Sequence, residues 1–196
     1  MKHLLITGFE PFGGEAVNPS WEAVSRLPDT LGNYRLTKLQ IPTVFAGAAE
    51  AVLAAAENDA PDAILCVGQA AGRDAVTPER IAVNMASAKR PDNAGNLPVE
   101  TPIDPAGPDG IFATVPVAAM AEAIIAAGLP GKISNTAGTY VCNDTLYRLL
   151  RHYAGSDVQV GFVHVPCLPE QAKEGEAAME LRDIIAALTV AVGVLG

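Results

Sequence analysis

Residues 63–68, AILCVG, decide the class of fold that this sequence adopts. The run is almost continuously apolar and ends at Gly68, as expected of a central β-strand that is covered on both faces. Before it, residues 45–58 are rich in alanine and predict a helix, which Pro61 would stop. An apolar strand that follows a helix in this way is typical of layered α/β proteins.

The same alternation of short apolar runs and helical runs continues outward in both directions. Asn18 and Pro19 predict a helix start, because asparagine caps well and proline suits the first helical position. Further strands are predicted at residues 4–9, 35–42, 80–86, 132–138 and 158–166, and further helices at 19–27, 117–127, 143–153 and 170–187. We therefore expect a single domain over residues 1–196, an α/β/α sandwich around a twisted, mostly parallel (mixed) sheet.

Composition excludes several classes of function. The net charge of −9, without a basic run, argues against nucleic-acid binding. The longest uncharged stretch, from Ile184 onward, is shorter than the ~20 residues that span a bilayer, so no membrane association is expected. Three cysteines without a secretory segment predict free thiols in a reducing compartment, the cytoplasm.

The chemically suggestive residues fall where ligands bind in such sheets, beyond the carboxyl ends of the strands. The segments that leave these ends are GFEPFGG, GQAAGR, SNTAGTYVCN, HVPCLPEQ and the proline-rich coil at 87–110. A coil of that length inside a compact domain is usually functional. No cysteine or histidine cluster has metal-ligand spacing, so we expect no metal.

Cys142 is the candidate nucleophile. It lies between a glycine-containing turn and a helix that is predicted to begin near Asn143. A helix N-terminus favours the thiolate, and its free N–H groups can hold an oxyanion. A buried structural cysteine fits this position equally well. Cys66 lies inside an apolar strand and should be inert, whereas Cys167 follows a strand end with no helix start beside it.

His164 is the candidate base, because it stands at the carboxyl end of the last strand, on the same rim as Cys142. His3 lies at the amino end of the sheet, and His152 comes late in a helix. A structural role for His164 is about as consistent with position alone. Glu79, just before a strand, would orient the base, but it reads more simply as an exposed acid paired with a nearby arginine.

Taken together, six segments resemble the pyroglutamyl peptidase type I family, cysteine peptidases that remove an N-terminal 5-oxoproline. They occur in family order and are ITGFEPFGG (6–14) with Asn18-Pro19, CVGQAAGR (66–73), TPERIAVN (77–84), PDNAGN (91–96), SNTAGTYVCN (134–143) and HVPCLPEQ (164–171). The resemblance implies an omega-peptidase without a cofactor that acts on pyroglutamyl peptides. It also implies a homo-oligomer, a dimer or a tetramer.

By this resemblance the catalytic triad is Cys142, His164 and Glu79. A pyroglutamyl ring is a neutral lactam, so its selection calls for an apolar slot with a few amide hydrogen bonds. The substrate-binding positions that the resemblance implies are Phe9, Phe12, Asn18, Thr43, Gln69, Tyr140 and Val141.

Two positions depart from the family pattern. The family's usual arginine, thought to help the oxyanion region, aligns with Lys89, and its apolar isoleucine, a pocket wall, aligns with Arg90. An arginine at a pocket wall could admit an acidic ligand. Two alternatives therefore stand beside the main interpretation: a related thiol amidase with altered specificity, and a non-catalytic relative that binds a small molecule.

Overall fold

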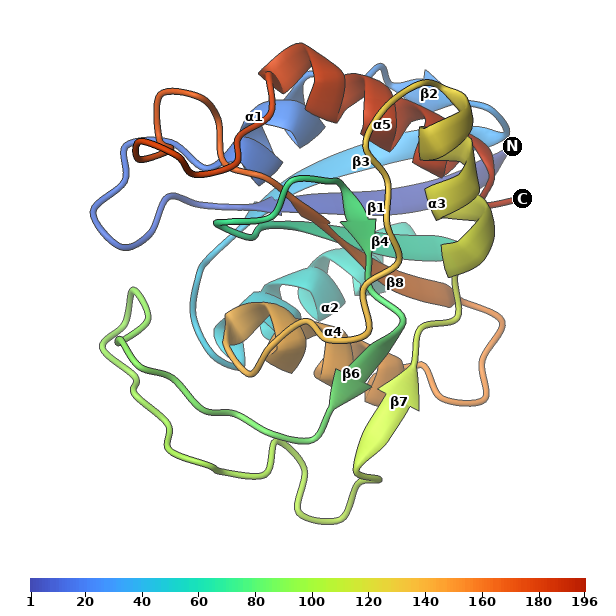
Figure 1. Ribbon diagram of the computed structural model, residues 1–196. Coiled ribbons are helices and arrows are strands. Elements are labelled where there is room, and N and C mark those ends of the chain that lie inside the picture. Colours follow the sequence, from blue (N-terminus) through green and yellow to red (C-terminus); the bar gives the residue numbers. More distant parts are fainter.

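The computed structural model describes residues 1–196 and is built on a six-stranded sheet with helices on both faces (Figure 1). The strand order is β2-β3-β1-β4-β8-β5, in which β3, β1, β4 and β8 are parallel and the two edge strands are antiparallel. The bounds are β1 Lys2–Phe9, β2 Thr30–Leu31, β3 Tyr34–Ile41, β4 Ala63–Gln69, β5 Thr77–Pro78 and β8 Gln159–Val165. The predicted α/β/α sandwich with a mostly parallel, mixed sheet is confirmed.

β4, the strand that contains AILCVG, lies inside the sheet. Residues 63–68 are all buried, and the strand pairs with β1 on one side and β8 on the other. Its apolar side chains point alternately to the two faces, so Leu65 joins one hydrophobic core and Ile64 the other. Burying a leucine or isoleucine contributes roughly 1.5–3 kcal/mol, which is why a run without polar residues belongs in this position.

Five helices cover the two faces (Figure 1). One face carries α1 (Pro19–Ser25), α3 (Val117–Ala126) and α5 (Leu181–Gly193), and the other carries α2 (Gly47–Asp59) and α4 (Val141–His152). α1 begins as predicted, because the Asn18 side chain accepts a hydrogen bond from the Ser20 N–H at 3.1 Å. None of the helices is long and apolar enough to cross a membrane.

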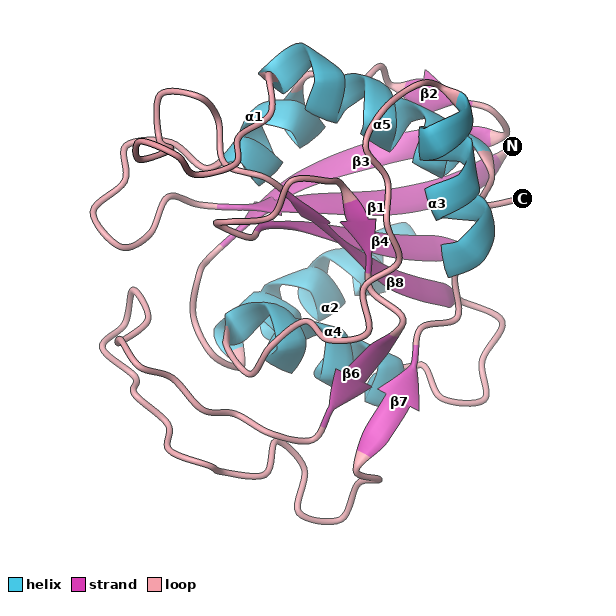
Figure 2. Ribbon diagram, viewed as in Figure 1, coloured by secondary structure: helices cyan, strands magenta, loops and turns pink.

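The long coil between β6 (Ile81–Val83) and β7 (Gly110–Phe112) runs outside the main sheet, as the pink loop between these strands in Figure 2 shows. The strand predicted over 80–86 is present but shorter, Ile81–Val83, and it pairs only with β7 in a separate two-stranded sheet. The Asn84 side chain turns the chain there. It donates to the Asp104 carbonyl at 2.7 Å and accepts from the Asp104 N–H at 2.9 Å, which closes the base of the coil.

Of two other predicted elements, one is absent and one begins later than expected. Residues 132–138 form no strand and make a single isolated bridge, which joins Ser134 to Glu79. The last helix begins at Leu181, after the predicted start at 170. Gly175 has a φ of +80°, and the Met179 N–H donates to the Cys167 carbonyl at 2.9 Å, so the intervening segment follows the end of β8 in a non-helical conformation.

Candidate active site

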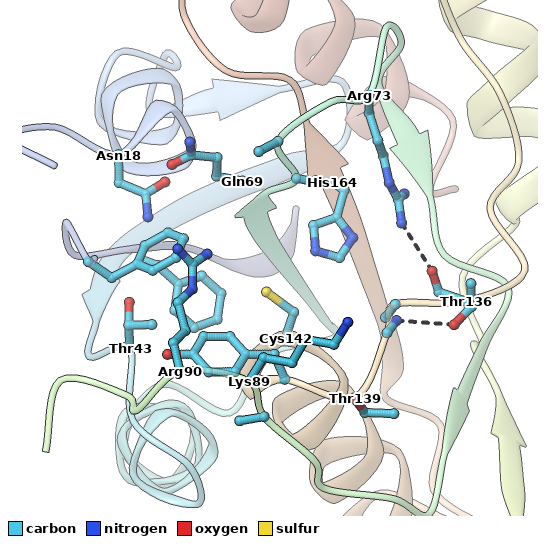
Figure 3. Close-up of a pocket in the computed structure, with 18 of the residues that line it drawn as sticks. Asn18, Thr43, Gln69, Arg73, Lys89, Arg90, Thr136, Thr139, Cys142 and His164 are labelled. Atoms are coloured by element: carbon cyan, nitrogen blue, oxygen red, sulfur yellow. Dashed lines mark hydrogen bonds between the residues drawn. The ribbon is translucent and has the colours of Figure 1, made fainter. Parts of the chain in front are cut away.

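A cavity of about 730 Å³ opens at the carboxyl edge of the sheet, beyond the ends of β1, β4 and β8. The proline-rich coil and the loop before α4 complete its walls (Figure 3). Every predicted site residue except Glu79 and Val141 lines this cavity: Phe9, Phe12, Asn18, Thr43, Gln69, Lys89, Arg90, Tyr140, Cys142 and His164. Segments far apart in the sequence are thus brought to one place by the parallel strands.

Cys142 lies in the first turn of α4. The helix begins at Val141, two residues before the predicted start, because Tyr140 is extended and Gly138 takes a φ of +77° that lets the preceding turn form. The first N–H groups of a helix have no intrahelical acceptor. Cys142 therefore presents its thiol to the cavity beside free backbone donors, as the sequence predicted.

His164 stands beside Cys142, at the end of β8 (Figure 3). Its Nδ1 lies 2.7 Å from Oε1 of Glu79. A carboxylate only accepts hydrogen bonds, so Nδ1 carries the proton and Nε2 keeps the lone pair that a base needs. The other histidines lie elsewhere: His3 bonds to Asp59 and Thr37 near the opposite end of the sheet, and His152 ends α4.

Glu79 is not the exposed acid that its neighbours suggest. It is completely buried, and Arg80 instead donates to Asn135 at 2.7 Å. The reason is the short edge strand β5, which pairs antiparallel with β8 and carries Glu79 to the imidazole, where the Glu79 N–H donates to the Phe162 carbonyl at 2.8 Å. The buried carboxylate is paired with Arg73, whose guanidinium lies 2.7 Å away.

Burial favours the neutral forms of the Cys142 thiol and the His164 imidazole. Although part of Cys142 is accessible from the cavity, the protein packed around its sulfur and the charge of Glu79 raise the pKa of this thiol to about 12. Burial also lowers the pKa of His164, against the opposing effect of Glu79. The backbone at the start of α4 still favours the thiolate, as predicted, but desolvation outweighs it.

Aromatic rings make one wall of the cavity. The Phe12 ring lies 6.4 Å from that of Tyr140, which packs edge-on against Phe45 at 5.3 Å. The Tyr140 hydroxyl donates to the Pro91 carbonyl at 3.0 Å and so ties this wall to the coil. Val141 does not contribute to it, because its side chain is fully buried in the core between α4 and the sheet.

The polar groups around the cavity differ in how far they are already satisfied. Asn18 donates to the Glu10 carbonyl at 3.0 Å and accepts from Ser20, and Thr43 also donates to that carbonyl, at 3.2 Å. Both side chains therefore brace the cavity wall. Gln69 donates to the Cys167 sulfur at 3.1 Å, while its buried Oε1 has no partner. Gln69 thus carries one unsatisfied buried acceptor at the cavity wall.

Lys89 and Arg90 both line the cavity, and their side chains point away from each other in Figure 3. The Arg90 guanidinium lies over the Phe12 ring, 5.0 Å from its centroid, a cation–π contact. Neither cation has a carboxylate within 4.0 Å. The two departures from the family pattern thus leave unpaired positive charge on the cavity wall.

At the carboxyl edge of the α/β sheet, a thiol lies beside an imidazole, and the imidazole pairs with a buried carboxylate. This arrangement defines a class of protein, the cysteine hydrolases with an α/β/α fold. Within that class the chain belongs to the pyroglutamyl peptidase family, whose model matches residues 2–195.

Individual relatives match over almost the whole chain. The pyrrolidone-carboxylate peptidase of Levilactobacillus brevis is 50% identical over 96% of this chain and 95% of its own length, and that of Lactobacillus helveticus is 46% identical over 96% of both. The crystal structure of Bacillus amyloliquefaciens pyroglutamyl peptidase I superimposes with a TM-score of 0.96 at 41% identity, over 100% of this chain and 97% of that one.

Arg73 is a site residue whose role could not be predicted from the sequence. It follows β4 at the end of the GQAAGR segment, lines the cavity and reaches Glu79. The signal was its place among the segments that leave the carboxyl ends of the strands. Its contact with Glu79 could not be predicted, because Glu79 is brought to this position by the edge strand β5, which has only two residues and shows no periodicity.

Proposed function

We propose that this chain is a cysteine peptidase that removes an N-terminal pyroglutamyl residue from peptides. The observation that carries the proposal is the 2.7 Å pairing of His164 Nδ1 with Glu79, beside a thiol at the start of α4. Membership in the pyroglutamyl peptidase family supports the same activity. The catalytic residues in this proposal are Cys142, His164 and Glu79.

The reaction follows from the neutral resting state. Nε2 of His164 takes the Cys142 proton as the sulfur attacks the carbonyl carbon of the pyroglutamyl residue. The free N–H groups at the start of α4 hold the oxyanion, and Glu79 stabilises the imidazolium. The imidazolium then gives its proton to the leaving amine. Water, activated by His164, hydrolyses the thioester and frees pyroglutamate.

The cavity suits a neutral lactam. The rings of Phe9, Phe12 and Tyr140 supply apolar walls for the five-membered ring. The unpaired Oε1 of Gln69 can accept the lactam N–H. An N-terminal proline has no lactam carbonyl and carries a charged ring amine instead, which is costly to bury in an apolar slot. A buried acceptor left without its partner costs ~1–3 kcal/mol, so a bond from the lactam N–H to this oxygen would stabilise the bound pyroglutamyl ring.

The test is hydrolysis of a pyroglutamyl-coumarin substrate before and after thiol alkylation. Cys142→Ala should remove activity by ~10⁴-fold or more, as the loss of a nucleophile does. Cys66→Ser and Cys167→Ser are the matched controls and should keep substantial activity, since neither thiol belongs to the triad. Wild-type turnover by the Cys142→Ala variant would disprove the assignment.

Two further parts of the proposal concern the cellular compartment and the oligomeric state. We place the enzyme in the cytoplasm, because its nucleophile must stay reduced and all three cysteines are free. A homo-oligomer, dimer or tetramer, remains a prediction from the family resemblance. Light scattering on the purified chain tests it, and a monomer mass at working concentration would contradict it.

A further inference from the structure

Arg73 contacts two segments that the reaction needs. Its Nη1 donates to Oε1 of Glu79 at 2.7 Å and also to the Thr77 hydroxyl, and its Nη2 donates to the Thr136 carbonyl at 3.0 Å. Figure 3 shows the side chain extending past His164 to Thr136. One guanidinium therefore joins the acid behind the base to the loop that leads to the nucleophile.

The loop around Thr136, which Arg73 contacts, is held by further hydrogen bonds. The Thr136 carbonyl accepts from the Ser134 hydroxyl as well, at 3.0 Å, and the Thr136 hydroxyl accepts from the Gly138 N–H at 3.1 Å. The chain then reaches Cys142 within four residues of Gly138. Because a planar guanidinium holds its donors in a fixed fork, Arg73 can set the distance between this loop and Glu79, which a lysine cannot do.

At the other end of Arg73, the contact with Glu79 is an ion pair. Glu79 is completely buried, and at rest its neighbour His164 is neutral, so Arg73 is the countercharge of the carboxylate. Arg73 and the imidazole share the same oxygen, Oε1. The fixed cation therefore opposes the charging of His164. Once His164 has taken the thiol proton, repulsion between the Arg73 cation and the imidazolium favours transfer of that proton to the leaving amine.

We propose that Arg73 is a positioning residue for the peptidase reaction: it fixes Glu79 against the nucleophile loop and holds His164 as a weak base that releases its proton readily. The inference rests on the proposed function. The charged and titratable groups that face the imidazole are Glu79 after β5, Arg73 after β4, Cys142 on α4 and Lys89 on the coil.

The test compares Arg73→Met, which keeps an unbranched apolar stem but none of the donors, with Arg73→Lys. Arg80→Met is the matched control, because the Arg80 side chain donates to Asn135 and makes no hydrogen bond or ion pair with the Glu79 carboxylate. Thermal unfolding first establishes that each variant is folded. kcat and KM for a pyroglutamyl-coumarin substrate are then measured from pH 4 to 9.

We expect Arg73→Met to lower kcat by about 10²-fold, with KM within about threefold, because misplacement affects the reacting groups more than the ring slot. The acid limb of kcat/KM should move to higher pH, since the opposing charge is gone. Arg73→Lys should restore the position of this limb but not the full kcat. A folded Arg73→Met variant with a wild-type limb, or an equal shift in Arg80→Met, would overturn the proposal.

Alkylation separates this inference from the proposed function. The rate at which iodoacetamide modifies Cys142 needs no peptide substrate, and its pH profile reports the coupling between thiol and imidazole. The profile should shift in Arg73→Met even if the wild-type chain fails to cleave pyroglutamyl peptides. Identical alkylation profiles for wild type and Arg73→Met would overturn the role of Arg73 whatever the substrate proves to be.

Discussion

At the scale of single residues, the two C-terminal histidines have different environments and should respond differently to mutation. His164 is buried against Glu79, whereas His152 is exposed at the end of α4. His164→Ala should be nearly as damaging as loss of Cys142, ~10³-fold or more in kcat, and His152→Ala should be mild. The comparison needs only kcat for the two variants, and equal damage from both would refute the role of His164.

Lys89 and Arg90 permit a second prediction at this scale. Arg90 covers the Phe12 ring with a charge that a neutral lactam cannot use. The double change Lys89→Arg with Arg90→Ile should raise kcat/KM on a pyroglutamyl substrate, because it supplies a planar donor near the oxyanion and an apolar wall for the ring.

The same double variant also tests the alternative of a thiol amidase with altered specificity. Pyroglutamyl and acidic amide substrates are measured side by side on the wild type and the double variant. A clear loss of pyroglutamyl activity on replacing the two cations would contradict the expectation. It would instead favour a native substrate with a carboxylate that contacts Arg90.

At the scale of elements, the sequence predicts well where apolar periodicity is strong. The strand at 63–68 and the helices around α1, α2, α3 and α4 lie where expected, within a few residues. Periodicity is absent from β5, which has two residues, and from the segment at 170–180, where backbone bonds to the end of β8 replace a helix. Position alone left Cys142 and His164 undecided, and Glu79 was identified only by family resemblance, since its burial depends on β5.

Asn143 connects two elements that position the site. Its amide accepts from the Val83 N–H at 2.9 Å and donates to the carbonyls of Val83 and Met85, which fastens α4 to β6. It is completely buried, so no water replaces these bonds. Asn143→Ala should therefore lower the free energy of unfolding by at least ~1–3 kcal/mol, the cost of one unsatisfied buried group, and reduce kcat by shifting the first turn of α4.

Chemical denaturation measures this effect. Asn58→Ala is the matched control, because that amide is exposed and bonds only to the Ala54 carbonyl of its own helix. The control should change the free energy of unfolding by less than ~0.5 kcal/mol. Equal stability losses in the two variants would show that the link between α4 and β6 contributes little.

At the scale of the whole molecule, the buried titratable groups limit stability on both sides of neutral pH. The pKa of His164 is lowered in the folded state, so the unfolded chain takes up that proton first as pH falls below 6.5, and stability decreases there. The thiols act on the other side. The pKa of Cys66 and that of Cys142 are each raised from 9.0 to about 12 by burial, so stability is full below pH 9 and decreases as pH rises toward 12.

The alkaline decrease can be assigned to individual thiols. Above pH 9 the unfolded chain loses the Cys66 proton while the folded chain keeps it, which costs about 1 kcal/mol over the first pH unit. Cys66→Ala should therefore flatten the fall in the free energy of unfolding between pH 9 and 10 by about that amount, and Cys142→Ala by less, because Cys142 faces the cavity. The cavity that each substitution leaves costs the same at every pH, so it cancels from the slope. Denaturation of the wild type, both single variants and the double variant at four pH values measures these slopes. If the free energy of unfolding falls as steeply with pH in the double variant as in the wild type, the buried thiols do not set the alkaline limit.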